Sequence, residues 1–278
     1  MLEDLPKSEI LPNFHDGGDA VPRDIPAQLW KMATTTVGLV SVRHGDNVNV
    51  MSAEWAYFVN KDPLYVAVVL SPRATSRKLI ESTGEFSLTL CSEDQPEIAD
   101  FAGSFSRDTI DKTASELIAF GEPEVVSSPW VEGGVVSLEC VLRETVPFPV
   151  HTMYVGEALA VHLPDRKRRP LVKHGGMHAL GAPLRRMAVV VTAQVVADDV
   201  LRVAATAPAV DGADEWRVTL LTSDGETVDL GCHPSAEYGD FLVDLPLPIE
   251  ASRLTGSRVK AERDGAEPGY ARLGVSLR

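Results

Sequence analysis

The chain has 278 residues, of which 44% are apolar, and its formal net charge is −14 with a sequence pI near 4.9. This length can form one large hydrophobic core or two smaller ones. The strong negative charge argues against a general surface for nucleic acid or anionic membranes, so we expect neither as a partner.

The cysteines and the N-terminal residues indicate where the protein resides. Cys91, Cys140 and Cys232 lie far apart in the sequence, without the spacing of metal ligands. An odd number of scattered cysteines is typical of reduced thiols in a cytoplasm. The chain begins Met1-Leu2-Glu3-Asp4, unlike a signal peptide, and contains no apolar run of roughly 18 residues. We therefore expect a cytoplasmic protein without a metal site.

The first part of the chain is predicted to form an arm and then a barrel. Residues 1–25 are rich in Pro, Gly and acids and are expected to be extended, and a short helix is predicted around 26–35, with Pro26 in its first turn. Strands are predicted at 37–43, 47–59, 64–70, 85–90, 135–144, 152–163 and around Leu171. Helices are predicted at 77–82, from a cap at Ser92 to about Phe101, and after a polar loop over 103–112. Residues 26–184 are thus predicted to be a β-barrel decorated by short helices.

The last part of the chain, residues 185–278, has a different pattern. Short strands separated by turn residues such as Asp224-Gly225 are predicted at 188–196, 201–205, 216–221, 227–231, 241–245, 257–261 and 271–277. This regular spacing predicts a small antiparallel β-sandwich, which makes the whole chain mainly β. The Cys232-His233 pair in it is a weak candidate for nucleophile and base, because neighbours on a strand point to opposite faces.

The seven residues from Asn49 to Trp55 are unusual for a strand that only fills a core. With the period of a strand, one face would carry Asn49, Met51, Ala53 and Trp55, and the other Val50, Ser52 and Glu54. Neither face is purely apolar. The combination of an amide, a hydroxyl and an indole is therefore not explained by core packing alone.

The loop from Ser71 to Arg77 follows a predicted buried strand and leads into a predicted helix. A helix N-terminus attracts anions, and Arg73, Thr75 and Ser76 would add a guanidinium and two hydroxyls. The loop could therefore hold a phosphate. Alternatively, Thr75 or Ser76 only caps the helix and Arg73 is solvated.

Other polar residues have both a functional and a purely structural interpretation. Lys112 follows a polar loop that contains Ser104 and could fold over a ligand, or it could simply be solvated. His151 could transfer protons or hydrogen-bond to an ionising ring, or it could be structural. His174 and His178 bracket Gly175-Gly176 in a predicted turn, which argues against a helical zinc pair. The basic turn 166–169 is either a solvated hairpin tip or a contact to the phosphate of a nucleotide co-substrate.

Taken together, these motifs resemble the flavin reductase-like proteins of the FMN-binding split-barrel class, in particular their flavoredoxin-type branch. The resemblance covers about residues 30–183. It rests on Asn49-x-Met51-Ser52-Ala53-x-Trp55, on Ser71-Pro72-Arg73-Ala74-Thr75, on Glu85-Phe86-Ser87-Leu88 and on Asp111-Lys112.

The resemblance implies a homodimer of six-stranded split barrels with FMN, or alternatively FAD, bound without a covalent bond near the subunit interface. It places Asn49 and Trp55 along the isoalloxazine ring, Arg73 and its neighbours at the phosphate, and Lys112 and His151 near the flavin. The predicted cofactor-binding set is Asn49, Met51, Ser52, Ala53, Trp55, Ser71, Arg73, Thr75, Ser76, Ser104, Lys112, His151 and His178, with His151 also as the catalytic residue.

Three features depart from the family pattern. Val150 stands where the family usually has Asp before the histidine, His178 lies in a region that is usually aromatic, and the C-terminal sandwich is an addition. Our leading hypothesis is an NAD(P)H-dependent flavin reductase that supplies reduced flavin to a partner monooxygenase. The alternatives are an FMN-bound biosynthetic enzyme that acts on an organic substrate and a non-catalytic flavin-binding protein.

Overall fold

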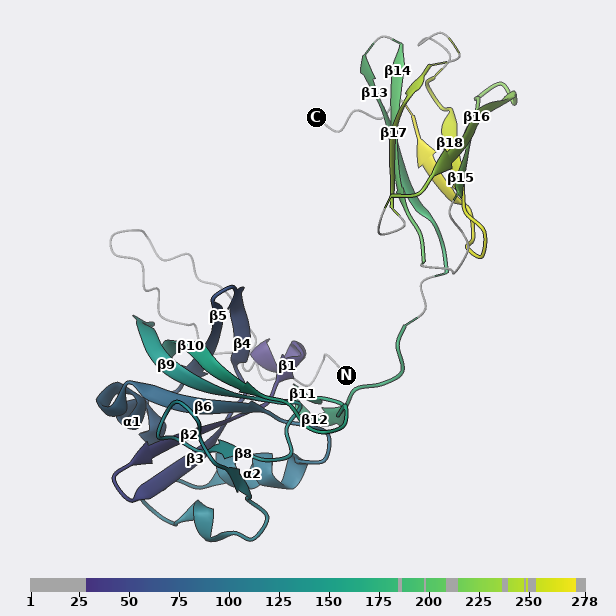
Figure 1. Cartoon of the computed structure of the whole chain (residues 1–278). Coiled ribbons are helices and arrows are strands. Elements are labelled where there is room, and N and C mark those ends of the chain that lie inside the picture. Colours follow the sequence, from purple (N-terminus) through teal and green to yellow (C-terminus); the bar gives the residue numbers. More distant parts are fainter. Residues whose placement is uncertain are drawn as a thin grey trace. The chain divides into compact units, whose positions relative to one another are not determined.

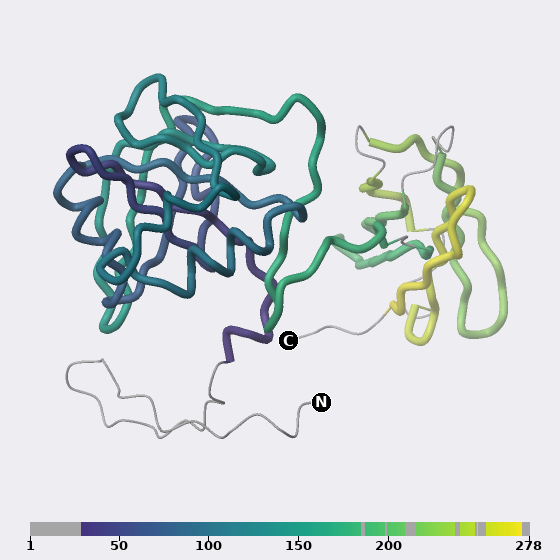
Figure 2. The backbone as a smooth tube through the Cα atoms, turned by 90° about the horizontal axis from the view of Figure 1, so that it is seen from below, coloured from purple at the N-terminus to yellow at the C-terminus, as the bar shows by residue number. Residues whose placement is uncertain are grey.

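The protein is described here by a computed structural model, which covers residues 29–184, 187–197, 199–208, 215–236, 240–247, 249 and 254–273. The chain divides between Gly181 and Ala182 into two compact units, which we call the first and the second unit. The predicted boundary, after residue 184, falls close to this division. The predicted N-terminal arm, residues 1–25, lies outside the described residues. Figure 2 traces the chain through the two units.

The first unit is built around one antiparallel sheet of seven strands (Figure 1). In chain order the strands are β2 (Gly38–His44), β3 (Asn47–Ala53), β4 (Ala56–Lys61), β5 (Leu64–Leu70), β6 (Glu85–Leu90), β9 (Val136–Pro147) and β10 (Thr152–His162). In space their order is β3-β2-β6-β9-β10-β5-β4, so β3 and β4 are the two edges of the sheet. Only Glu54 and Trp55 connect these two edge strands. The sheet must therefore curl until its edges meet, which makes it a barrel that is split between β3 and β4.

Short elements complete the first unit. They are η1 (Leu29–Met32), β1 (Thr35–Thr36), α1 (Thr75–Thr83), α2 (Pro96–Ser104), η2 (Lys112–Ala114), β7 (Phe120–Gly121), β8 (Trp130–Val131), β11 (Leu171–His174) and β12 (Gly176–Ala179). Leu79 and Ile80 of α1 pack into the core cluster that contains Val40 and Val42. Ala99 and Ala102 of α2 pack into another cluster, together with Leu39 and Val50. The two helices thus cover opposite faces of the β2–β3 hairpin.

Several predicted elements differ from the structure. The predicted strand 47–59 is wrong, because β3 pairs with β2 whereas β4 pairs with β5, and the chain breaks at Glu54 and Trp55 to pass between these partners. The sheet has seven strands, not the six that the resemblance implies. Ser92 does not cap α2: the N-cap is Gln95, and the Ser92 hydroxyl donates to the carbonyl of Gly133.

The second unit is the predicted antiparallel sandwich. One sheet has the order β13 (Val190–Ala197), β14 (Val200–Thr206) and β17 (Phe241–Pro246). The other has the order β16 (Thr227–Pro234), β15 (Glu215–Leu221), β18 (Arg258–Glu262) and β19 (Gly269–Arg272). Trp216 is fully buried between them and stacks on Phe241, in a core that is otherwise made of aliphatic side chains. The mainly β fold class is confirmed.

None of the helices in the described parts of the chain has the length and apolar character of a membrane span.

Candidate functional site

A pocket of about 240 Å³ lies where the barrel is split. Its lining residues are Trp30, Met51, Ser52, Ala53, Glu54, Trp55, Val69, Leu70, Ser71 and His151. The rings of Trp55 and His151 lie 5.1 Å apart between centroids, tilted by 47°. We call this cavity the split pocket. It brings together the Asn49–Trp55 segment, the start of the Ser71 loop and His151, which are far apart in the sequence.

The strand pairing explains why these residues meet. The backbone N–H of Val69 in β5 donates to the carbonyl of Trp55 at 2.9 Å, which fixes the link between β3 and β4. Thr152, the first residue of β10, pairs with Leu70, the last residue of β5. His151 and Ser71, which flank these two residues, therefore lie at the same end of neighbouring strands.

The edge position of β3 leaves backbone groups available at the site. β3 pairs with β2 from Asn47 to Ala53, and no second strand of the described chain pairs with its other side. N–H and C=O groups on the free side of an edge strand can hydrogen-bond to another molecule. A flat heterocycle with alternating donors and acceptors suits such an edge.

The N-terminus of α1 is open. Its N-cap residue is Ala74, and no side chain caps the helix. The alternative that Thr75 or Ser76 caps α1 is therefore wrong. The Thr75 hydroxyl instead lies 3.2 Å from that of Ser106, and the Ser76 hydroxyl accepts from Asn49 Nδ2 at 2.7 Å. The first amides of α1 thus remain available to an anion.

Asn49 is the clearest sign of a missing partner. Its side chain is 3% exposed, and its Oδ1 has no hydrogen-bond partner among the described residues. Exchanging the amide oxygen and nitrogen would still leave one of the two atoms unpaired, because only Ser76 contacts this amide. A buried polar atom without a partner destabilises the protein by about 1–3 kcal/mol, and a ligand can supply that partner.

Lys112 is buried, not solvated. Its Nζ donates to the carbonyls of Ala102 at 3.0 Å and Phe105 at 2.9 Å, at the end of α2. Burial lowers the pKa of Lys112 from 10.5 to about 8. The sequence gives the preceding loop little reason to be rigid, but this ammonium ties the loop to α2. The same loop contacts Thr75 through Ser106 and Asp108.

The remaining predicted residues are dispersed. Arg73 is exposed at the start of the α1 loop. Ser104 is the last residue of α2 and lines a second pocket of about 280 Å³, which shares Ser52 and Glu54 with the split pocket. His178 is exposed in the β11–β12 hairpin, where its Nε2 lies 3.2 Å from the carbonyl of His174.

The described residues contain no group of three His, Cys, Asp or Glu side chains that could hold a metal ion. The basic turn at residues 166–169 has a structural explanation. In the basic turn, Arg168 pairs with Asp94 at 2.6 Å and Arg169 with Glu93 at 3.6 Å. These ion pairs fix the turn to the start of the α2 segment.

The sequence analysis did not identify Trp30 as a site residue. Its side chain is 49% exposed, yet it lines the split pocket from η1, and β1, which follows η1, pairs with β11. Nothing in the local sequence shows this contact, because it depends on pairing across the whole unit. The only signal in the sequence was an indole side chain just before the first strand.

Comparisons with known proteins identify the family of the first unit. Residues 31–181 match the family model described as "Flavin reductase like domain". An uncharacterized protein of Pyrococcus abyssi is 32% identical over 126 residues, which cover 44% of this chain and 70% of that protein. The NADH-dependent flavin reductase of a Rhodococcus species is 27% identical over 172 residues, which cover 57% and 88%.

Solved structures show the same fold. The flavoredoxin of Methanosarcina acetivorans superposes with a TM-score of 0.51 at 22% identity, covering 59% of this chain and 94% of that one. The NADH:FAD oxidoreductase of Streptomyces globisporus C-1027 gives a TM-score of 0.51 at 18% identity, covering 56% and 91%. The family match spans more than half of the chain and confirms the predicted class, an NAD(P)H:flavin oxidoreductase. The chain belongs to the flavin reductase-like family, with a β-sandwich appended after its family domain.

Proposed function

We propose that the first unit binds FMN along β3 and reduces it with NAD(P)H for use by a partner monooxygenase. The observation that carries this proposal is a series of groups from the split pocket to α1 that a flavin could contact. It starts at the Trp55–His151 ring pair, continues along the free edge of β3 to the unpaired amide atom of Asn49, and ends at the open helix N-terminus.

The residues present fit an FMN molecule. Trp55, Met51 and His151 offer a partly apolar wall for a flat ring, and the β3 edge offers hydrogen bonds to its polar side. Thr75, Ser76 and the first amides of α1 would hold the phosphate, with Arg73 within the same loop as a cation. When bound, the flavin supplies the group that accepts hydride from the nicotinamide.

The chain's own residues would act through position. Lys112 would fix the loop that contacts Thr75, and so set the shape of the phosphate site. His151, whose ring contacts that of Trp55, would hold a proton or make a hydrogen bond at the flavin ring. Because Val150 precedes it, no neighbouring carboxylate orients this imidazole from that position.

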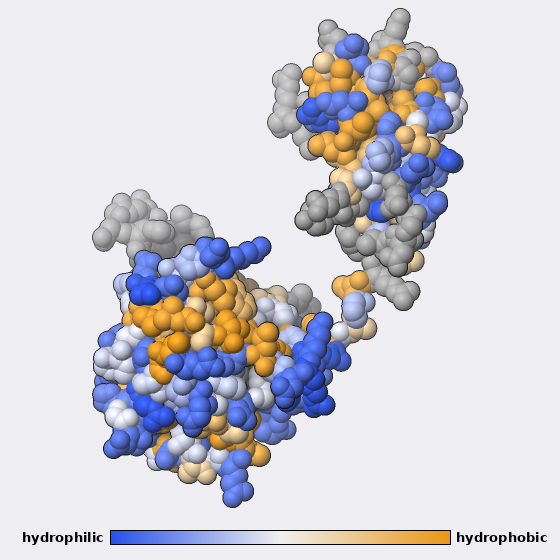
Figure 3. All heavy atoms as spheres, viewed as in Figure 1, coloured by the Kyte–Doolittle hydropathy of each residue, from blue (hydrophilic) through white to orange (hydrophobic). Residues whose placement is uncertain are grey.

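We also propose that the first unit forms a homodimer through its exposed apolar strands. Large apolar side chains that are at least 39% exposed lie on β4 and β10, namely Tyr57, Phe58, Val59, Leu159 and Val161. Figure 3 shows apolar residues gathered on the face of the first unit over β9 and β10. Contiguous patches of this kind mark interfaces. Light scattering should give twice the 30.0 kDa mass of one chain.

Steady-state oxidation of NADH or NADPH with added FMN tests the proposed activity. We expect turnover with at least one nucleotide. His151→Ala should lower kcat by about tenfold or more and change FMN affinity little, as a group near the reacting atoms would. His44→Ala, which changes an exposed histidine at the end of β2 that does not line the split pocket, is the matched control. No oxidation of either nucleotide would contradict the proposal.

A further inference from the structure

A carboxylate lies at the open N-terminus of α1. Asp108 belongs to the loop between α2 and η2, and its Oδ2 accepts from the Thr75 hydroxyl at 3.3 Å. The hydroxyl of Ser106, in the same loop, lies 3.2 Å from that of Thr75. Thr75 is the first residue of α1, and no side chain caps this helix. Because a helix N-terminus attracts negative charge, Asp108 takes a position that suits a bound anion.

The loop that carries Asp108 is fixed at both ends. At its start, two carbonyls at the end of α2 accept from the buried Lys112 ammonium. At its end, the side chain of Asp111 caps η2. Asp108 itself is exposed in the turn between these anchors. Its carboxylate can therefore leave Thr75 while the two ends of the loop stay in place.

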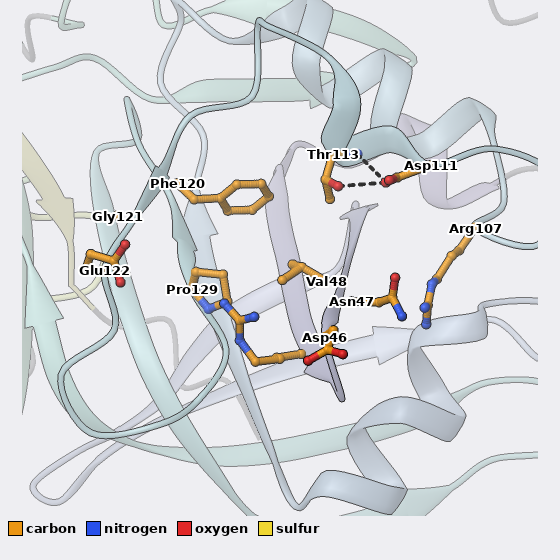
Figure 4. A pocket seen from close by; sticks show the side chains of 11 residues that line it. Asp46, Asn47, Val48, Arg107, Asp111, Thr113, Phe120, Gly121, Glu122 and Pro129 are labelled. Carbon is orange, nitrogen blue, oxygen red and sulfur yellow. Dashed lines mark hydrogen bonds between the residues drawn. The ribbon is translucent and has the colours of Figure 1, made fainter.

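The charge of Asp108 is not neutralised by a neighbouring cation. None of the ion pairs in the described parts of the chain involves this carboxylate. Arg107, next to it in the sequence, lines a pocket of about 530 Å³ beside the β2–β3 turn, where Figure 4 shows it together with Asn47. Hydrogen bonds from Thr113, with a smaller contribution from Arg107, lower the pKa of Asp111. The charge of Arg107 thus acts on another acid.

The Thr75 hydroxyl has one proton and cannot donate fully to two acceptors. In the structure the acceptor is Asp108, whereas in the proposed flavin complex it is a phosphate oxygen. A phosphate monoester carries about two negative charges near neutral pH, so a carboxylate at this distance repels it. The contact is longer than the usual range of about 2.5–3.0 Å for an O–H···O hydrogen bond, so it is weak and easily exchanged.

We propose that Asp108 competes with the flavin phosphate for the N-terminus of α1. The proposal rests on the proposed function, because it requires the phosphate of FMN to bind there. The carboxylate leaves Thr75 when FMN enters and returns when FMN departs, so FMN binds less tightly than the helix end alone would allow. Easy release suits a protein that passes reduced flavin to a monooxygenase. Asp108 is thus a specificity-determining residue that lowers the preference for FMN over riboflavin, which has no phosphate.

The test compares FMN and riboflavin on the full-length protein freed of flavin. Asp108→Asn removes the charge and keeps the size of the side chain. By fluorescence titration, its FMN affinity should be about threefold to tenfold higher and its riboflavin affinity unchanged. Glu116→Gln is the matched control, because it removes the same charge from an exposed acid outside the split pocket. This control should change neither affinity.

Stopped-flow measurement of FMN release gives a second readout. Dissociation from the Asp108→Asn protein should be slower by about the same factor, because the group that replaces the departing phosphate has lost its charge. The difference should shrink in about 1 M salt, which screens exposed charges.

The possible outcomes separate this proposal from the proposed function. An FMN affinity that is unchanged or lower in Asp108→Asn would overturn the proposal and leave the proposed function standing. An equal gain for riboflavin would do the same, because the phosphate would not be what Asp108 opposes. A gain that came only from faster association would indicate repulsion at a distance and would contradict competition at Thr75. If none of the proteins binds flavin, the proposed function itself fails.

Discussion

Both units are antiparallel β structures with large apolar cores, but they differ in what they bury. Besides its apolar core, the first unit buries many polar or charged side chains, among them Ser41, Asn49, Ser76, Ser87, Thr89, Gln95, Lys112, Ser137 and Glu139. In the described part of the second unit the buried polar set is Thr222, Ser257 and Arg263. Burying polar groups destabilises a fold unless partners are present. Polar interiors therefore mark the unit that is built around a site.

Glu139 shows how tightly the polar interior of the first unit is arranged. The fully buried carboxylate accepts from the backbone N–H groups of Glu124, Val125 and Val126, and it contacts His162 Nε2 at 2.7 Å. Burial alone would raise the pKa of Glu139, but these hydrogen bonds lower it overall. Both units also bury aromatic side chains fully, Phe86 and Tyr154 in the first unit and Trp216 in the second, so aromatic burial does not distinguish them.

The largest effect is expected for Glu139→Ala. Removal of the carboxylate leaves three backbone N–H groups without an acceptor, one of them buried and two part-buried, and should destabilise the first unit by about 3–5 kcal/mol. Calorimetry should show the transition of the first unit shifted down and that of the second unit unchanged. Glu144→Ala, an exposed acid on the same strand, is the control. Equal shifts of both transitions would mean that the two units do not unfold separately.

The next largest effect is the pH dependence that Lys112 gives to the free energy of unfolding. Its pKa is about 8 when folded and 10.5 when exposed, so the unfolded chain binds more protons between these values. The free energy of unfolding should therefore rise from pH 8 to pH 10.5, by at most about 3 kcal/mol. Lys112→Met should lack this rise. Parallel urea-denaturation profiles of the two proteins over this range would refute the burial of the ammonium.

A smaller effect is expected at the phosphate site. Thr75→Val removes the hydroxyl at the open end of α1, and should weaken FMN binding by about 1–3 kcal/mol. Thr83→Val, at the other end of the same helix, is the matched control, because its hydroxyl donates to the carbonyl of Leu79 inside the helix. Equal FMN affinities in the two variants, measured by fluorescence titration, would place the phosphate elsewhere.

The smallest effect is expected from removal of the second unit. A chain that ends after Leu184 keeps every residue of the split pocket and of α1. Its FMN affinity should equal that of the full chain. A large loss of affinity would show that the sandwich takes part in the flavin site, and would overturn the contrast between the two units.

Local patterns in the sequence predicted many of the strands and helices, but not the breaks between strands or the pairing of strands in the sheet. The continuous apolar run of β5 and the alternation of β6 gave these strands their observed bounds. The break at Glu54 and Trp55 has no local signal, because it arises when β4 pairs with β5 at the opposite edge of the sheet. The seventh strand of the sheet results from this same break, which divides the predicted strand 47–59 into β3 and β4. Their pairing with different partners is a property of the closed sheet, not of the local sequence.

The candidate site was only partly predictable for a similar reason. Residue types indicated an anion at the Ser71–Arg77 loop, and the family resemblance implied a flavin beside Trp55. The partners of those residues came from elsewhere in the chain: Asn49 for Ser76, Ser106 for Thr75, and Trp30 for the split pocket. The burial of Lys112 was not predictable, because its two carbonyl acceptors belong to the end of α2.

The most direct test is a titration of FMN into the purified full-length chain, followed by its visible absorption spectrum. A ring that enters the cleft between β3 and β4 should show a perturbed spectrum with micromolar affinity, and Trp55→Ala should abolish the perturbation. An FMN spectrum identical to that of the free compound at every protein concentration would contradict the account.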